Sequence, residues 1–326
     1  MICKICLKEN ATSKNYPDYH NVCLSRLFDS TVVSPILQFN RDIFKTEMTK
    51  KYVRGMSISG VQKKLSLKIA NNTLSLTDVG GTYILKPTVE DFPELSQNEH
   101  LSMLIGKALD IETPPLGLIK FSNDELTYVI KRFDWKGNEK IHKEDMTSIF
   151  NLSRDKDETY KYGQSYEQVG LKIREITNGK MGVVLGFFNR LVYNFLIQNA
   201  DFHLKNISVV ADKLSRSGFY DTLAPNYDSA MTRLYLPNEH ELALAPLKDD
   251  ETPEAFKTFG YLTRPDFEQL ALKIGLTTAA AALFFEKIKK RKNEIFELID
   301  NSFLGDSLKE KYRTNLVERM KQLKID

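Results

Sequence analysis

Residues 199–206, Asn-Ala-Asp-Phe-His-Leu-Lys-Asn, bring several side chains that could take part in chemistry into one short stretch. The preceding residues, 182–198, have apolar side chains at helical spacing and predict a buried helix that delivers this loop. Transfer of a γ-phosphoryl group requires a carboxylate to orient the attacking hydroxyl and an oxygen ligand for Mg²⁺, both fixed by a rigid element. We therefore predict that Asp201 is a catalytic residue and that Asn206 is a magnesium ligand.

The spacing of these two residues matches the Asp-x-x-x-x-Asn half of the protein-kinase catalytic loop, although the His-Arg that would precede the aspartate is missing. Such a short motif also occurs by chance, so the hypothesis requires other parts of a phosphotransferase elsewhere in the chain. His203 could be a base or a hydrogen-bonded loop anchor beside the nucleotide. Its apolar neighbours Phe202 and Leu204 favour the anchor.

A lysine and a glutamate upstream have the spacing of a phosphate-binding pair. Residues 82–87 predict a short strand that ends in Lys86 and a proline, and residues 95–109 predict a helix that contains Glu99. Kinases use a Lys–Glu pair between a strand and the following helix to orient the lysine toward the nucleotide phosphates. A solvated strand end is the common alternative for a lysine. We predict that Lys86 and Glu99 belong to the nucleotide site.

Residues 54–62 form a small, glycine-flanked polar segment ahead of two alternating stretches, 64–70 and 73–77, which predict a β-hairpin with its turn at Asn71-Asn72. Small residues let backbone N–H groups approach phosphate oxygens. This pattern predicts a nucleotide-binding loop that contains Ser57, Ser59 and Gly60. A simple turn remains the alternative for a Gly-Ser segment.

Two further residues complete the predicted site. Strands predicted at 116–121 and 126–130 lead into Lys-Arg-Phe-Asp, where Phe133 would mark a hinge that meets the adenine ring. Asp228 follows an apolar step and could be the second Mg²⁺ ligand, in the place of the aspartate of the kinase Asp-Phe-Gly motif.

The distribution of strand and helix signals indicates an α+β protein with two lobes. Residues 1–134 are predicted to form a mixed β/α N-lobe, in which 1–30 are a Cys/His knuckle and 54–134 are the loop, hairpins and hinge. Beyond about residue 140 strand signals nearly vanish, so 135–326 are predicted to form a mainly helical C-lobe. A chain of 326 residues is long enough to bury two such cores.

The knuckle contains all three cysteines, in a Cys-x2-Cys and a His-x2-Cys pattern: Cys3, Cys6, His20 and Cys23. These residues could bind Zn²⁺ tetrahedrally, or the thiols could pack without metal. With four protein ligands no position would stay open for catalysis, so any zinc here is predicted to be structural.

Charge and composition exclude several classes of protein. A balance of 46 basic and 43 acidic residues, net +3, is too near neutrality to predict direct nucleic-acid binding. No apolar run approaches the roughly 20 residues of a membrane span. The amino terminus lacks a signal-peptide pattern, and three cysteines cannot all pair. We expect a cytoplasmic protein.

Taken in order, these motifs resemble the HipA family of bacterial serine/threonine kinases from about residue 55 to the carboxyl terminus. The motifs are Ser-x-Ser-Gly-Val-Gln, Tyr-Ile-Leu-Lys-Pro, Asn-Glu, Lys-Arg-Phe-Asp, His-Lys-Glu-Asp at 142–145, Asn-x-Asp-x-His-x-x-Asn and Tyr-Asp. The resemblance implies a two-lobed protein-kinase-like fold that uses ATP and Mg²⁺. It also implies a toxin of a toxin–antitoxin system that phosphorylates an aminoacyl-tRNA synthetase.

The chain departs from HipA itself because it has no room for the extra amino-terminal subdomain. It is more similar to the compact HipT-type toxins of tripartite systems, in which that subdomain is a separate small antitoxin and a helix-turn-helix DNA-binding antitoxin is the third partner. Ser57 matches the autophosphorylated loop serine of the family, and Ser59 adds a second hydroxyl as in HipT-type kinases. A phosphoserine beside the ATP phosphates would repel them, so we predict autoinhibition by phosphorylation.

The main hypothesis is therefore a cytoplasmic serine/threonine kinase toxin. One alternative is a non-catalytic ATP-binding interaction module that holds antitoxin proteins, which intact Asp201, Asn206, Asp228 and Lys86 disfavour. Another is a zinc-knuckle nucleic-acid binder, which the near-neutral charge disfavours.

Overall fold

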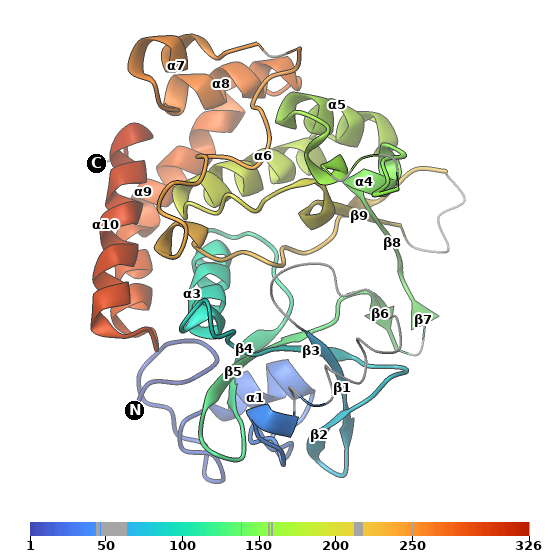
Figure 1. Ribbon diagram of the computed structural model, residues 1–326, viewed down its shortest axis with the longest axis vertical. Helices are drawn as coiled ribbons and strands as arrows, with labels where there is room; N and C mark the ends of the chain where they lie inside the picture. Colours follow the sequence, from blue (N-terminus) through green and yellow to red (C-terminus); the bar gives the residue numbers. More distant parts are fainter. Residues whose placement is uncertain are drawn as a thin grey trace. The chain divides into compact units, whose positions relative to one another are not determined.

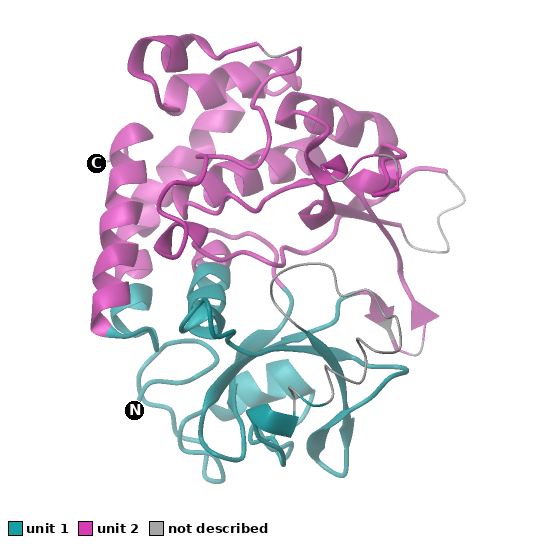
Figure 2. Cartoon of the chain, viewed as in Figure 1, with its two compact units in different colours: residues 1–104, 114–133, 297–305 teal, residues 105–113, 134–296, 306–326 magenta. Residues whose placement is uncertain are grey.

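The computed structural model describes residues 1–43, 46, 64–137, 139–155, 157, 159–211, 218–249 and 251–325. Two compact units make up the chain (Figure 2). The sheet unit comprises Met1–Leu104, Pro114–Phe133 and Glu297–Gly305, and the helical unit comprises Ile105–Thr113, Asp134–Phe296 and Asp306–Asp326. The predicted nucleotide loop, with Ser57, Ser59 and Gly60, lies outside the described residues.

The sheet unit is built on an antiparallel five-stranded sheet of order β2-β1-β3-β5-β4 (Figure 1). Its strands are β1 (Leu65–Ala70), β2 (Thr73–Leu76), β3 (Tyr83–Lys86), β4 (Leu116–Lys120) and β5 (Leu126–Lys131). The predicted hairpin turn is confirmed, because Asn71 and Asn72 have φ of 51° and 56°, in the left-handed region that asparagine tolerates.

Alternation along the strands divides the side chains of the sheet between its two faces. Leu65, Leu67 and Leu85 belong to an apolar core with the buried side of helix α1 (Asn21–Phe28). Lys86 directly follows Leu85 and so points to the opposite face, toward helix α3 (Leu95–Ala108). The position of Lys86 in the strand therefore fixes which helix its side chain can reach.

The helical unit contains most of the helices of the chain. They are α4 (Met146–Ile149), α5 (Tyr166–Ile176), α6 (Met181–Leu196), α7 (Glu254–Phe259), α8 (Arg264–Lys273), α9 (Thr278–Asp300, whose last residues belong to the sheet unit) and α10 (Asp306–Gln322). Short 3₁₀ turns are η1 (Tyr160–Tyr162), η2 (Leu204–Asn206) and η3 (Thr232–Leu234). Residues 264–326 carry three helical patterns in the sequence, and the structure confirms them as α8, α9 and α10.

Helix α6 is the buried helix that the apolar pattern of 182–198 predicted. Its Phe195 lies 4.8 Å from Phe267 of α8 between ring centroids, and the guanidinium of Arg319 in α10 lies 4.4 Å from the Phe195 ring. Packing on two helices fixes the end of α6, and residues 199–206 follow directly.

Strands persist beyond residue 140 further than the sequence indicated. A three-stranded sheet of order β10-β9-β8 joins β8 (His142–Asp145), β9 (Ser208–Ala211) and β10 (Thr222–Leu223), and β6 (Trp135–Lys136) pairs with β7 (Glu139–Lys140). Of these five strands the sequence predicts only β9, as a short strand at residues 207–211. Strand β8 is short, polar and at a sheet edge, so no apolar alternation marks it.

Within the described ranges, the helices are all too short or too polar to cross a lipid bilayer.

Candidate active site

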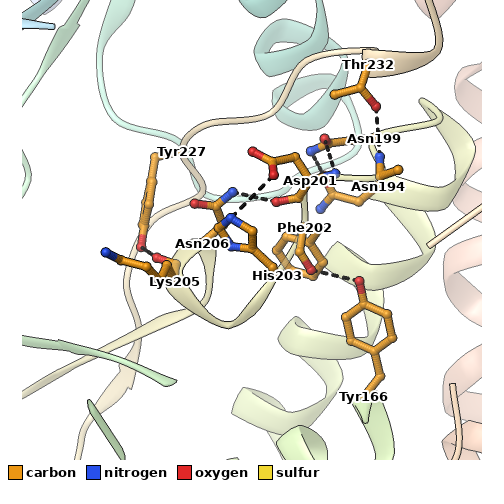
Figure 3. A network of polar contacts seen from close by, with 11 residues as sticks. Tyr166, Asn194, Asn199, Asp201, Phe202, His203, Lys205, Asn206, Tyr227 and Thr232 are labelled. Atoms are coloured by element: carbon orange, nitrogen blue, oxygen red, sulfur yellow. Dashed lines mark hydrogen bonds and ion pairs between the residues drawn. The ribbon is translucent and has the colours of Figure 1, made fainter. Parts of the chain in front are cut away.

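The loop that follows α6 is held by a hydrogen bond from helix α5 and by hydrogen bonds among its own residues (Figure 3). The Tyr166 hydroxyl of α5 donates to the Phe202 carbonyl at 2.7 Å, and the two rings stack with centroids 6.1 Å apart. The Asp201 N–H donates to Asn199 Oδ1 at 3.1 Å. The loop is therefore anchored through its backbone, which leaves the Asp201 carboxylate available for other contacts.

Asp201 and Asn206 are brought together by this loop, as Figure 3 shows. Asn206 Nδ2 donates to the Asp201 carbonyl at 2.6 Å. Because a carbonyl can only accept, this contact fixes the orientation of the amide and turns Asn206 Oδ1 away from Asp201 O. The side chain of Asp201 is 55% exposed, so a substrate hydroxyl can reach its carboxylate.

His203 lies beneath the same carboxylate. Its Nε2 is 3.4 Å from Asp201 Oδ1, and its side chain is only 7% exposed. Burial lowers the pKa of His203 despite the nearby Asp201 charge. A neutral ring that donates from Nε2 leaves Nδ1 as an acceptor, and no described group hydrogen-bonds to that buried nitrogen. This geometry suits an anchor that orients Asp201 better than a base.

Asn194, in the last turn of α6, links the Asp201 loop to the segment that contains Asp228. Its Oδ1 accepts from Asn199 Nδ2 at 2.8 Å and from the Ser229 hydroxyl at 3.3 Å. Sequence reasoning missed Asn194, although a buried polar residue in a mainly apolar helix was the available signal. We assign Asn194 a positioning role, since its partner Asn199 lies two residues before Asp201 and its partner Ser229 directly follows Asp228.

Asp228 adopts φ of 55°, in the left-handed region that aspartate enters more readily than most residues with a side chain. The preceding Tyr227 is held by its hydroxyl, 2.6 Å from the Ser208 hydroxyl and 3.1 Å from the Lys205 carbonyl. Asp201, Asn206 and Asp228 all offer carboxylate or amide oxygens, which are the hard ligands that Mg²⁺ prefers. The chemistry of these donors therefore fits a magnesium ion.

In the sheet unit, the structure brings Lys86 and Glu99 together. Lys86 Nζ of β3 lies 2.5 Å from Glu99 Oε1 of α3, and the two side chains are 6% and 3% exposed. The Ser96 hydroxyl of α3 donates to the Lys86 carbonyl at 2.8 Å, which also fixes the strand against the helix. Phe133, the predicted hinge residue, is half-buried and is the last residue of the Pro114–Phe133 segment of the sheet unit.

A second polar network supports the backbone immediately before Asp201. The Thr232 hydroxyl oxygen accepts the Ala200 N–H at 3.0 Å, and it lies 3.1 Å from the Gln198 carbonyl and 2.5 Å from Glu239 Oε1. Burial raises the pKa of Glu239 from 4.5 to about 7, and the charge of Asp201 contributes in the same direction. The Thr232 hydroxyl has one proton to donate, so an ionised Glu239 carboxylate competes with the Gln198 carbonyl for it. A protonated Glu239 can instead donate its own proton to the Thr232 oxygen.

This arrangement predicts a pH-dependent contribution of Glu239 to stability, which the substitution Glu239→Gln removes. A raised carboxyl pKa means that the folded state binds the proton more tightly than the unfolded state. The contribution of Glu239 is therefore most favourable below pH 4.5 and is lost as the pH rises through about 7. Urea unfolding across this range should show the wild type losing stability relative to Glu239→Gln as the pH rises.

The exposed Glu254→Gln variant is the matched control and should follow the wild-type pH profile, since the Glu254 side chain is 76% exposed. Parallel profiles of wild type and Glu239→Gln would contradict the proposed protonation of Glu239.

Comparisons with known proteins identify relatives over most of the chain. The family model described as HipA-like C-terminal domain matches residues 56–295. A Haemophilus influenzae protein named "Putative kinase" is 32% identical over 324 residues, which cover 93% of this chain and 91% of that protein. The "Putative kinase Y4dM" of Sinorhizobium fredii is 29% identical over 206 residues, and the match spans about half of that relative, 48% of its length.

Two solved structures have a similar fold. The HipA toxin of Shewanella oneidensis, solved with HipB and operator DNA, gives a TM-score of 0.63 at 20% identity over 82% of this chain and 65% of that one. The Helicobacter pylori proinflammatory kinase CtkA gives 0.56 at 18% identity over 82% of this chain and 91% of that one. The predicted α+β, two-lobed kinase-like fold is therefore confirmed.

Proposed function

The chain belongs to the HipA-like C-terminal domain family, whose relatives include proteins named as kinases, and from this premise we propose that it is an ATP-dependent protein serine/threonine kinase. The observation that most supports this activity is the Asp201 loop. It combines a half-exposed carboxylate with an amide oxygen whose orientation is fixed by the loop itself. These are the two groups that phosphoryl transfer requires of a catalytic loop.

In the proposed reaction, Asp201 orients the attacking hydroxyl and accepts its proton, and His203 and Asn206 keep Asp201 in place. Asn206 and Asp228 would hold Mg²⁺, and the ion would neutralise the charge that develops on the phosphates. Lys86, oriented by Glu99, would contact the nucleotide phosphates, and Phe133 would meet the adenine ring.

The proposed substrate is a serine of a translation protein, specifically an aminoacyl-tRNA synthetase, and the proposed biological role is that of a cytoplasmic toxin. The Shewanella oneidensis structure contains HipA with HipB and operator DNA. By analogy, we propose a DNA-binding antitoxin partner for this chain and a small antitoxin similar to the amino-terminal subdomain of HipA. Phosphoproteomics after brief expression of wild type and of Asp201→Asn tests the substrate. Phosphosites on translation proteins should appear with the wild type alone, and their absence would exclude this substrate class.

We further propose that phosphorylation of Ser57 and Ser59 switches the kinase off, because a phosphoserine brings nearly two negative charges beside the ATP phosphates. The Ser57→Ala/Ser59→Ala variant should retain ATP binding during prolonged incubation with Mg-ATP, whereas the wild type should lose it. Binding of a fluorescent ATP analogue after different incubation times measures this difference. Equal loss in both proteins would refute the autoinhibition.

A further inference from the structure

The knuckle at the amino terminus brings its four candidate ligands to one point. The ligand atoms of Cys3, Cys6, His20 and Cys23 all lie within 4.8 Å of one another. His20 Nδ1 is 3.4 Å from Cys6 Sγ and 3.8 Å from Cys23 Sγ. Tetrahedral Zn²⁺ with ordinary Zn–S and Zn–N bond lengths sets its sulfur and nitrogen ligands about 3.6 Å apart. The two observed distances bracket that value.

The contacts around these ligands also fit a metal centre. His20 Nε2 is 3.0 Å from the Glu9 carbonyl, and because a carbonyl only accepts, Nε2 must carry the proton of a neutral ring. The Nδ1 lone pair then faces the sulfurs, as in zinc sites where the second histidine nitrogen donates to a backbone carbonyl. The backbone N–H of His20 donates to Cys3 Sγ at 3.4 Å, and the described cysteines form no disulfide.

The two residues between the first pair of ligands connect this cluster to strand β4 and helix α3 of the same unit. The Lys4 carbonyl accepts the Leu118 N–H of β4 at 2.9 Å. Ile5 packs on Gly117 so closely that a Cβ added there would lie 2.7 Å from Ile5 Cγ1. The Ile5 carbonyl lies 3.1 Å from Nε2 of His100 in α3.

His100 is the residue next to Glu99 in α3, and it is fully buried. Burial lowers the pKa of His100 to about 4, so the ring is neutral and donates to Ile5 from Nε2. A cluster that fixes Lys4 and Ile5 therefore also fixes the turn of α3 that contains Glu99.

We propose that Cys3, Cys6, His20 and Cys23 bind one structural Zn²⁺, and that this ion holds the Lys4–Ile5 segment against Leu118 of β4 and His100 of α3. The four side chains complete a tetrahedral set, and two of them, Cys3 and Cys23, are buried. The ion therefore has no open coordination position that could serve catalysis. Its role is to fasten the amino-terminal knuckle to strand β4 and helix α3 within the sheet unit, independently of the proposed kinase activity.

Elemental analysis of the full chain, purified without chelators, tests the proposal directly. About one zinc per chain is expected for the wild type, and reconstitution with Co²⁺ should give the visible absorption of a tetrahedral thiolate site. His20→Ala should lose both signals. His240→Ala is the matched control, because His240 is an exposed histidine of the helical unit, and it should retain both.

Hydrogen exchange of the wild type tests the fastening role without any variant. Chelation should raise the exchange rate of the Leu118 amide and of peptides from α3, while α6 in the helical unit stays protected. Wild-type zinc content no higher than that of His20→Ala, or a disulfide among the three cysteines, would overturn the metal site. Unchanged exchange at Leu118 after complete zinc removal would overturn the fastening role.

Discussion

Asp201→Asn is expected to lower transfer of the ATP γ-phosphoryl group by about 10²- to 10⁴-fold, the usual contribution of a positioned acid–base group. An amide cannot accept the proton of the attacking hydroxyl. The substitution should leave the loop intact, because Asp201 is held through its backbone N–H and carbonyl, at 3.1 Å from Asn199 Oδ1 and 2.6 Å from Asn206 Nδ2. Labelled phosphate from γ-labelled ATP, incorporated into the protein itself, measures the loss.

Asp155→Asn is a suitable control, since Asp155 is an exposed aspartate of the same unit, and it should transfer phosphate like the wild type. Thermal unfolding should be similar for all three proteins. Undiminished transfer by Asp201→Asn would remove this residue from the mechanism. Absence of transfer by the wild type, with ATP binding retained, would favour the alternative of a non-catalytic ATP-binding module.

The parts of the fold that the sequence predicted correctly are those set by neighbouring residues. Two consecutive asparagines gave the β1–β2 turn because both tolerate positive φ. Helix α6 was predicted because its apolar residues repeat at the helical period. Strand β8 was missed because its pairing with β9, more than 60 residues later, is what makes it a strand, and its own residues are polar.

The same distinction applies to the candidate site. Asp201 and Asn206 lie in one loop. Lys86 ends a strand, and Glu99 lies near the start of the next helix. The spacing of the motifs was therefore enough to group each pair. The contributions of Asn194 and Thr232 depend on partners distant in sequence. Asn194 meets Ser229 and Thr232 meets Gln198 only after the helical unit has folded, and no local pattern in the sequence encodes those contacts.

Lys86→Met is expected to lower the free energy of unfolding by about 3–5 kcal/mol, the usual cost of removing one partner of a buried ion pair. The Lys86 and Glu99 side chains are 6% and 3% exposed, so solvent cannot replace the lost ammonium. Urea denaturation with an unchanged m-value would measure the effect. Lys257→Met is the matched control. It breaks an ion pair of similar length whose side chains are 51% and 76% exposed, and it should cost at most about 1 kcal/mol.

The double variant Lys86→Met/Glu99→Gln separates the structural role of the pair from its proposed nucleotide role. With the buried charge removed as well, most of the lost stability should return, because replacing both members of a buried pair is often nearly neutral. ATP affinity should not return, since neither methionine nor glutamine can neutralise phosphate. Recovery of both stability and ATP affinity would show that Lys86 serves the fold alone. Recovery of neither would show that Glu99 has further partners in α3 that need its charge.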